Sequence, residues 1–181
     1  MSDVVRKAAD FAKTAHESID QRRKYTNEPY IVHPRAVAEI VSSITDDEST
    51  IAAAWLHDVV EDTPITIEQI TDEFGADIAR LVADLTKPST KNDGDRRQRK
   101  EIDRQHTARA DPRAKTIKLA DLIDNLSDIA TSDPGFATMY LNEKELQLQV
   151  LAEGHPELFK RVQVIIRDAK ALIAANTERL K

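Results

Sequence analysis

The sequence of 181 residues contains no cysteine. This absence excludes disulfide bonds, thiolate zinc sites and cysteine nucleophiles. Any metal that the protein binds must therefore be held by histidine nitrogens and carboxylate oxygens. Glycine is also scarce, with four residues, and aromatic residues make up only 4% of the chain. Few helix-breaking glycines, together with few of the aromatic residues that β-sheets use for packing, favour an all-α fold.

The sequence also lacks long apolar runs. No stretch is apolar over enough consecutive residues to span a bilayer, and residues 1–7 lack the apolar core of a signal peptide. We therefore expect a cytoplasmic protein that does not contact a membrane. The length suits one compact domain, and no internal repeat or linker is recognisable. We predict that residues 1–181 form a single domain.

Charge is unevenly distributed along the chain. The formal net charge is -6, which argues against a nucleic-acid-binding protein. Residues 91–115, however, contain nine Lys or Arg against five Asp or Glu, whereas the rest of the chain contains 17 against 27. A basic segment in an acidic chain suits a small anionic ligand. A solvated charged helix would explain the same composition.

Apolar residues recur at helical spacing through most of the chain. The pattern predicts helices over residues 4–19, 34–44, 51–60, 65–74 and 76–85. Further helices are expected in the basic segment between residues 95 and 111, from 111 on, from about 134 to about 151, and from 156 on. Pro34 stands where proline can open a helix, Gly75 separates two helices, and residues 87–95 have the composition of a loop. The segment 51–60 is apolar on nearly every side, so it should be central and buried.

His57 and Asp58 stand in the middle of this apolar segment. A charged aspartate there is costly unless it is paired or coordinated to a metal. Taken alone, a buried His-Asp dipeptide is more often a satisfied core pair. On a continuous helix, however, Glu61 and Asp62 lie one turn further on and share the faces of His57 and Asp58. Four ionisable groups on two turns of an apolar helix indicate a functional site.

Two other segments carry candidate ligands. Asp121 has apolar neighbours in the sequence, and Asn125 lies one turn beyond it. His33 directly precedes Pro34 and, taken alone, would be structural or incidental. His16 is interpreted as a helix-surface or pocket-edge residue.

The order of these motifs resembles the HD hydrolase domain of RelA/SpoT-type proteins, and more closely the stand-alone small alarmone hydrolases. The resemblance rests on His33-Pro34, on His57-Asp58 followed by Glu61-Asp62, and on Lys118 to Asp121 with Asn125, and it extends from about residue 16 to residue 151. An HD dipeptide alone is a weak motif, whereas this ordered set is specific. No synthetase domain is expected, because the remaining length would not accommodate one.

The resemblance implies an all-helical HD-domain bundle with one Mn²⁺ held by His33, His57, Asp58 and Asp121. It further implies that Glu61 and Asp62 orient or deprotonate the attacking water. The reaction of the family is removal of the 3′-pyrophosphate from guanosine tetra- or pentaphosphate, which releases pyrophosphate and GDP or GTP. The expected enzyme is thus a Mn²⁺-dependent (p)ppGpp 3′-pyrophosphohydrolase, a phosphoric diester hydrolase.

The same resemblance implies a set of contacts to a small-molecule nucleotide. The implied substrate-binding residues are Arg23, Lys24, Asn125, Tyr140 and Lys144. A basic stretch of the family corresponds to Arg96, Arg97, Arg99 and Lys100, about half of which we expect to face solvent. A nucleotide with two pyrophosphate groups needs several such cations to balance its charge.

Three departures from the family pattern concern the base rather than the metal. Tyr25-Thr26-Asn27 replaces a shorter glycine-containing turn, and Leu122 and Ser127 stand where basic residues are frequent. Guanine and adenine alarmones, (p)ppGpp and (p)ppApp, therefore both stay open as substrates.

Two alternative functions are compatible with the sequence. An HD phosphohydrolase that acts on another nucleotide would differ in releasing orthophosphate. A non-catalytic nucleotide-binding HD module would have lost metal ligands or the acidic pair, and here all of them are present. The sequence leaves the oligomeric state open, and a homo-oligomer is compatible with it.

Overall fold

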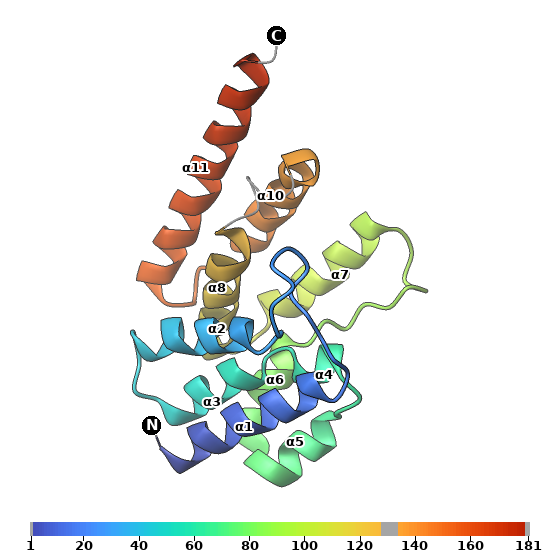
Figure 1. Cartoon of the computed structure of the whole chain (residues 1–181), viewed down its shortest axis with the longest axis vertical. Coiled ribbons are helices and arrows are strands. Elements are labelled where there is room, and N and C mark those ends of the chain that lie inside the picture. The colour runs from blue at the N-terminus through green and yellow to red at the C-terminus, as the bar shows by residue number, and fades with distance from the viewer. Residues whose placement is uncertain (1, 128–133, 180–181) are drawn as a thin grey trace.

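The computed structural model describes residues 2–127 and 134–179, and within these residues it contains ten α-helices and no β-strand (Figure 1). The helices are α1 (Asp3–Glu17), α2 (Val32–Ser42), α3 (Glu48–Leu56), α4 (Val59–Asp62), α5 (Ile67–Phe74), α6 (Ala76–Leu85), α7 (Arg96–Ala108), α8 (Pro112–Leu126), α10 (Pro134–Leu148) and α11 (Pro156–Arg179). The predicted all-α class is confirmed. None of the described helices has the length and apolar character needed to cross a membrane.

α3 lies in the centre of the bundle and contacts α1, α2, α6 and α8. Its residues Ala52, Ala53 and Ala54 are fully buried, and their small side chains allow the surrounding helices to pack closely. The helix begins after Asp47, whose carboxylate accepts the backbone N–H of Thr50 at 3.2 Å. The prediction of a buried central segment is therefore confirmed.

The prediction of one continuous helix over 51–60 is wrong, because α3 ends at Leu56 and α4 begins at Val59. The His57 Nδ1 atom lies 2.8 Å from the carbonyl oxygen of Ala54. In an unbroken helix the backbone N–H of Asp58 would donate to that oxygen. The imidazole takes this acceptor instead, and Asp58 adopts φ -105° and ψ -4°. His57 and Asp58 thus stand at a break between two helices.

α8 is buried on several sides, because it packs against α2, α3, α6 and α11. It begins at Pro112 after the capping residue Asp111, as the sequence predicts. Every residue from Ala114 to Ile123 is buried, including the polar residues Lys115, Lys118 and Asp121. α8 therefore carries polar side chains into the core, where they must find partners.

The remaining elements follow the predicted pattern with small shifts. Gly75 separates α5 from α6 with φ +82°, a conformation that favours glycine. α2 begins at Val32, so Pro34 occupies its first turn rather than its first position, where the missing N–H is still harmless. α10 packs along α11, whose far end projects away from the rest of the bundle (Figure 1). α10 begins at Pro134, as predicted, and the residue that precedes it lies outside the described residues.

Candidate metal centre

Two histidines and two aspartates from three parts of the fold converge at one point. His33 comes from α2, His57 and Asp58 from the break between α3 and α4, and Asp121 from α8. The Nε2 atoms of His33 and His57 lie 3.2 Å apart. The Oδ2 atom of Asp58 lies 3.0 Å from Nε2 of His57 and 3.5 Å from Nε2 of His33. The Oδ1 atom of Asp121 lies 3.2 Å from Nε2 of His33 and 3.9 Å from Nε2 of His57.

The hydrogen bonds of the two imidazoles indicate what this cluster can bind. Nδ1 of His57 faces the carbonyl oxygen of Ala54, which can only accept, so Nδ1 carries the proton. Nδ1 of His33 donates in the same way to Oδ2 of Asp124 at 2.6 Å. When both rings are neutral, their Nε2 atoms therefore direct lone pairs towards the two carboxylate oxygens. Such a set of converging lone pairs needs a cation, and two imidazoles with two carboxylates suit a borderline divalent ion.

The electrostatics of the cluster also favour a cation. Burial lowers the pKa of His33, but hydrogen bonds to Asp121, Asp124 and Asp58 outweigh burial and raise that pKa to about 11. Burial would raise the pKa of Asp58, yet the charges of His57 and His33 hold that pKa well below its usual range. Asp121 behaves in the same way beside Lys118. Without a metal, the ionised carboxylates therefore keep a proton on His33, and a bound divalent cation would take the place of that positive charge.

Three further residues support the cluster, and we did not predict two of them from the sequence. The hydroxyl of Tyr30 donates to Oδ2 of Asp58 at 2.6 Å, and Asp124 holds His33 as described above. The third, Lys118, lies with Nζ 2.7 Å from Oδ2 of Asp121. Asp124 follows Asp121 by three residues on α8, a spacing that puts both on one side of a helix and would have been the signal to find it.

The predicted acidic pair lies on α4, within one turn of Asp58. Glu61 forms an ion pair with Lys87. Oδ2 of Asp62 accepts a hydrogen bond from Nε2 of Gln21 at 2.8 Å. Burial and the neighbouring charge of Asp58 raise the pKa of Asp62, which is the direction that suits a proton acceptor.

Two of the predicted substrate-binding residues adjoin the cluster directly. The Arg23 guanidinium lies 3.1 Å from Oδ2 of Asp124 and donates to Oδ1 of Asn125 at 3.3 Å. The amide nitrogen of Asn125 in turn donates to Oδ1 of Asp121 at 2.5 Å. Lys24 lies further out, 4.7 Å from the ring centroid of Tyr25. Arg23 and Asn125 are thus connected to the proposed metal ligands, whereas Lys24 lies with Nζ 5.5 Å from the ring centroid of Phe136 on α10.

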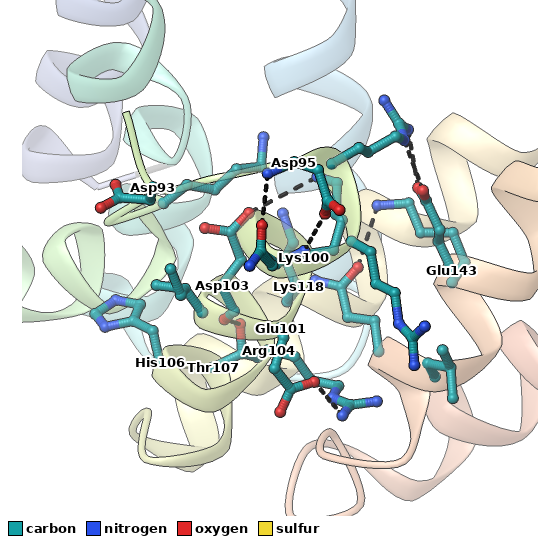
Figure 2. Close-up of a pocket in the computed structure, with 18 of the residues that line it drawn as sticks. Asp93, Asp95, Lys100, Glu101, Asp103, Arg104, His106, Thr107, Lys118 and Glu143 are labelled. Carbon is teal, nitrogen blue, oxygen red and sulfur yellow. Dashed lines mark hydrogen bonds and ion pairs between the residues drawn. The ribbon is translucent and has the colours of Figure 1, made fainter. Parts of the chain in front are cut away.

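Of the other two predicted residues, Lys144 lines a pocket of about 1140 Å³ between α7 and α10, whereas Tyr140 is not among its lining residues. Lys118 belongs both to this pocket and to the cluster, and Figure 2 shows it close to Lys100 in the interior, with Glu143 on the α10 side. Nζ of Lys144 lies 3.1 Å from Oε1 of Gln147 and 5.0 Å from the ring centroid of Tyr140. Burial, together with the charge of Lys118, lowers the pKa of Lys144 to about 7.

The basic stretch on α7 divides between the pocket and its outside. Arg96, Arg97 and Lys100 line the pocket, and Arg96 is held by Glu143 through a bond of 2.6 Å. Arg99 is not among the lining residues and donates to the carbonyl oxygen of Gly94 at 2.9 Å. The pocket therefore combines several cations on one side of the metal cluster.

The burial of His16 excludes one of the two positions expected for it. His16 is only 1% exposed, so it is not a helix-surface residue, and its place at the edge of a pocket stays a prediction. Packing of α1 against Tyr30 covers the imidazole, since the two ring centroids are 4.9 Å apart. Leu122 is fully buried in the core, and the hydroxyl of Ser127 donates to the carbonyl oxygen of Ile123. Because Leu122 lies in the core, it cannot make the ligand contact that a basic residue would make.

Comparison with known proteins gives consistent matches. A family model described as "HD domain" matches residues 8–147. The guanosine-3′,5′-bis(diphosphate) 3′-pyrophosphohydrolase MESH1 of Xenopus tropicalis is 38% identical over 135 residues, which cover 72% of this chain and 72% of that protein. The human protein of the same name is 40% identical over 131 residues, or 70% of each chain.

Longer bacterial relatives match over a smaller part of their length. A probable pyrophosphohydrolase of the same description from Synechocystis is 42% identical over 123 residues, and the chain spans only 16% of its length. Among solved structures, one described as a metazoan ortholog of SpoT that hydrolyzes ppGpp superposes with a TM-score of 0.82 at 30% identity. That match covers 93% of this chain and 96% of the other.

Proposed function

The chain belongs to the HD-domain family, and on that premise we propose that it is a metal-dependent pyrophosphohydrolase of 3′-pyrophosphorylated nucleotides. The observation that carries this proposal is the convergence of His33, His57, Asp58 and Asp121, with both Nε2 lone pairs directed at one point. The names of the relatives support (p)ppGpp as the substrate. The adenosine counterpart (p)ppApp is the second substrate to be tested.

In this proposal His33, His57, Asp58 and Asp121 hold one Mn²⁺. Such an ion supplies Lewis acidity that makes a water more acidic and a phosphorus more electrophilic. Asp124 and the Ala54 carbonyl fix the tautomers that leave Nε2 for the metal, and the ion would displace the proton that the carboxylates otherwise keep on His33. The neutral and anionic donors together favour Mn²⁺ over an ion that binds only oxygen.

The acidic pair and the cationic side chains have different roles in the proposed reaction. Asp62 orients the attacking water and accepts its proton, and Glu61 fixes Lys87 beside it. Arg23 and Lys118 stand next to the proposed ligands, where they neutralise the pyrophosphate that is being released. Lys144 and Tyr140 bind phosphate groups from the side of the pocket, and Lys24 and Asn125 bind the nucleoside side. The products are pyrophosphate and a nucleoside 5′-di- or triphosphate.

A panel of nucleotides tests this proposal. The purified protein is stripped of metal, reloaded with Mn²⁺ and offered guanosine and adenosine 3′-pyrophosphates, GTP and dGTP, and the products are identified by ³¹P NMR. We expect pyrophosphate from at least one 3′-pyrophosphorylated nucleotide and no cleavage of GTP or dGTP. Orthophosphate as the product, or cleavage of dGTP alone, would favour an HD phosphohydrolase of a different nucleotide. Binding without cleavage would indicate a non-catalytic module.

A further inference from the structure

The carboxylate of Asp62 is held by a residue that none of the motifs includes. Nε2 of Gln21, which follows α1, donates to Oδ2 of Asp62 at 2.8 Å. The other end of the same amide, Oε1 of Gln21, lies 2.7 Å from Nδ1 of His16. A chain of two hydrogen bonds therefore runs from the core of the bundle to the acidic pair.

The directions of these hydrogen bonds follow from the chemistry of the three groups. An ionised carboxylate can only accept, so the NH₂ group of Gln21 must face Asp62. Its carbonyl oxygen then faces His16 and can only accept a hydrogen bond, so Nδ1 must carry the proton and donate it. Burial lowers the pKa of His16, so the ring is neutral near pH 7 and carries a single N–H. Nε2 of His16 is buried without a hydrogen-bond partner, and a bare lone pair there avoids an orphaned N–H donor.

Packing holds His16 in this position. Its side chain lies at the inner face of α1, and its ring is 4.9 Å from the ring of Tyr30, whose hydroxyl donates to Asp58. Among the described residues, Nδ1 is the ring nitrogen of His16 that forms a hydrogen bond, and its partner is Gln21. His16 itself is linked to the acidic pair only through that amide among the contacts of the described residues.

We propose that Gln21 is a positioning residue for Asp62, and that His16 sets the orientation of the Gln21 amide. The proposal rests on the proposed function, in which Asp62 handles the attacking water. Without the hydrogen bond, the Asp62 side chain would be free to adopt other rotamers, and fewer of them would hold the water in line with the phosphorus. The expected consequence is a loss in kcat with little change in substrate or metal binding.

The first test compares Gln21→Leu, Asp62→Asn and the double variant. We expect Gln21→Leu to lower kcat by about tenfold or more, a part of the contribution that a general base makes, while KM and Mn²⁺ affinity stay unchanged. In the Asp62→Asn background, Gln21→Leu should have no further effect, because its role is exercised through Asp62. Equal losses in both backgrounds, or a loss confined to KM, would contradict the proposal.

The second test uses the geometry of the His16 donor. The side-chain nitrogen of Asn can take the place of Nδ1 of His, whereas that of Gln reaches further along the side chain towards the place of Nε2. His16→Asn should therefore retain much of the wild-type kcat, and His16→Gln should resemble Gln21→Leu. Thermal unfolding of both variants separates this effect from loss of the fold. Similar kcat values for the Asn and Gln variants would mean that His16 has only a packing role.

A third measurement does not depend on turnover. In protein labelled with ¹⁵N-histidine, long-range ¹H–¹⁵N correlation spectra report which ring nitrogen of His16 carries the proton, with His16→Asn as the assignment control. We expect the Nδ1–H tautomer in the wild type and its loss in Gln21→Leu. An Nε2–H tautomer would overturn the proposal even if the protein is active. Absence of turnover in the wild type would instead contradict the proposed function.

Discussion

At the scale of single residues, the His33 ring depends on Asp124 for the direction of its lone pair. The substitution Asp124→Asn keeps the size of the side chain but removes its charge, and allows its amide nitrogen to face the ring. We expect the affinity for Mn²⁺ to fall by about 10–100-fold, as for other residues that orient metal ligands. Isothermal titration of the metal-free protein measures this change. The control is Asp20→Asn, a substitution of an exposed aspartate that contacts none of the proposed ligands in the described structure. Equal Mn²⁺ affinities of the two variants would contradict the role of Asp124.

Lys144 gives a prediction about pH. Its pKa is lowered to about 7, so the side chain is cationic below that pH and neutral above it. Because a phosphate group binds the cation, KM for the nucleotide should increase as the pH rises from one unit below this pKa to one unit above it. Lys144→Met should remove this pH dependence, while Lys170→Met, whose lysine pairs with Glu145 in another groove, should retain it. An unchanged KM–pH profile in Lys144→Met would show that Lys144 does not bind the substrate.

The sequence was informative for some of these residues and silent on others. His57, Asp58 and Asp121 stand out because charged residues are unexpected in apolar segments, and the structure brings them together with His33. The partners of His33 and Asp62 are different, because Asp124 and Gln21 reach them from 91 and 41 residues away along the chain. Gln21 is not unusual in its own segment, and the spacing of Asp124 from Asp121 indicates only that both lie on one side of α8. The long-range contacts exist only after the helices pack, so no local pattern reveals which side chain each of them reaches.

At the scale of elements, the break between α3 and α4 matters most for the site. Apolar periodicity predicts a continuous helix there, because it reports which side chains are buried and not which carbonyl groups are occupied. The side chain of His57 occupies the Ala54 carbonyl oxygen, and this interaction has no signature in hydrophobic spacing. The starts of α6 at Ala76 and α8 at Pro112 were predictable, since Gly75 and Asp111-Pro112 determine them through the backbone itself.

The contact of α8 with the turn before α11 gives a stability prediction. A Cβ atom added to Gly154 would lie 2.8 Å from Cδ1 of Leu119 and 3.1 Å from the backbone of Lys115 and Thr116. Gly154→Ala should therefore lower the free energy of unfolding by about 1–3 kcal/mol, as in other overpacked cores. Gly135→Ala is the matched control, because a Cβ there meets no atom of the described residues within 4 Å. Urea unfolding measures both, and equal stabilities would contradict the close packing at Gly154.

At the scale of the whole molecule, α8 connects the early helices with the late ones. It contacts α2, α3 and α6 as well as α11, and it carries both Asp121 and Lys118. The single domain over residues 1–181 stays a prediction, in which α8 would connect the early helices with the late ones. The metal centre joins α2, the α3–α4 break and α8, so a bound ion would link elements that are distant in the sequence.

Because a bound ion would hold these three elements of the folded chain together, we predict that the metal stabilises the fold. An ion that binds only the folded state adds about 2.7 kcal/mol at a free concentration 100 times its Kd. Addition of Mn²⁺ to the metal-free protein should therefore raise Tm, and excess EDTA should reverse the increase. Scanning calorimetry of the wild type and of His57→Ala measures the effect. A similar rise in Tm for both proteins would mean that the ion binds elsewhere.

In the proposed function, one metal ion bound at this cluster is required for the release of pyrophosphate. The most direct test measures bound Mn²⁺ and pyrophosphate released from guanosine tetraphosphate, or from its adenosine counterpart, for the wild type and Asp58→Ala, with Asp46→Ala as the surface control. We predict that Asp58→Ala loses both the metal and the turnover while Asp46→Ala retains both. Full activity of Asp58→Ala, or turnover that survives complete removal of the metal, would contradict the account.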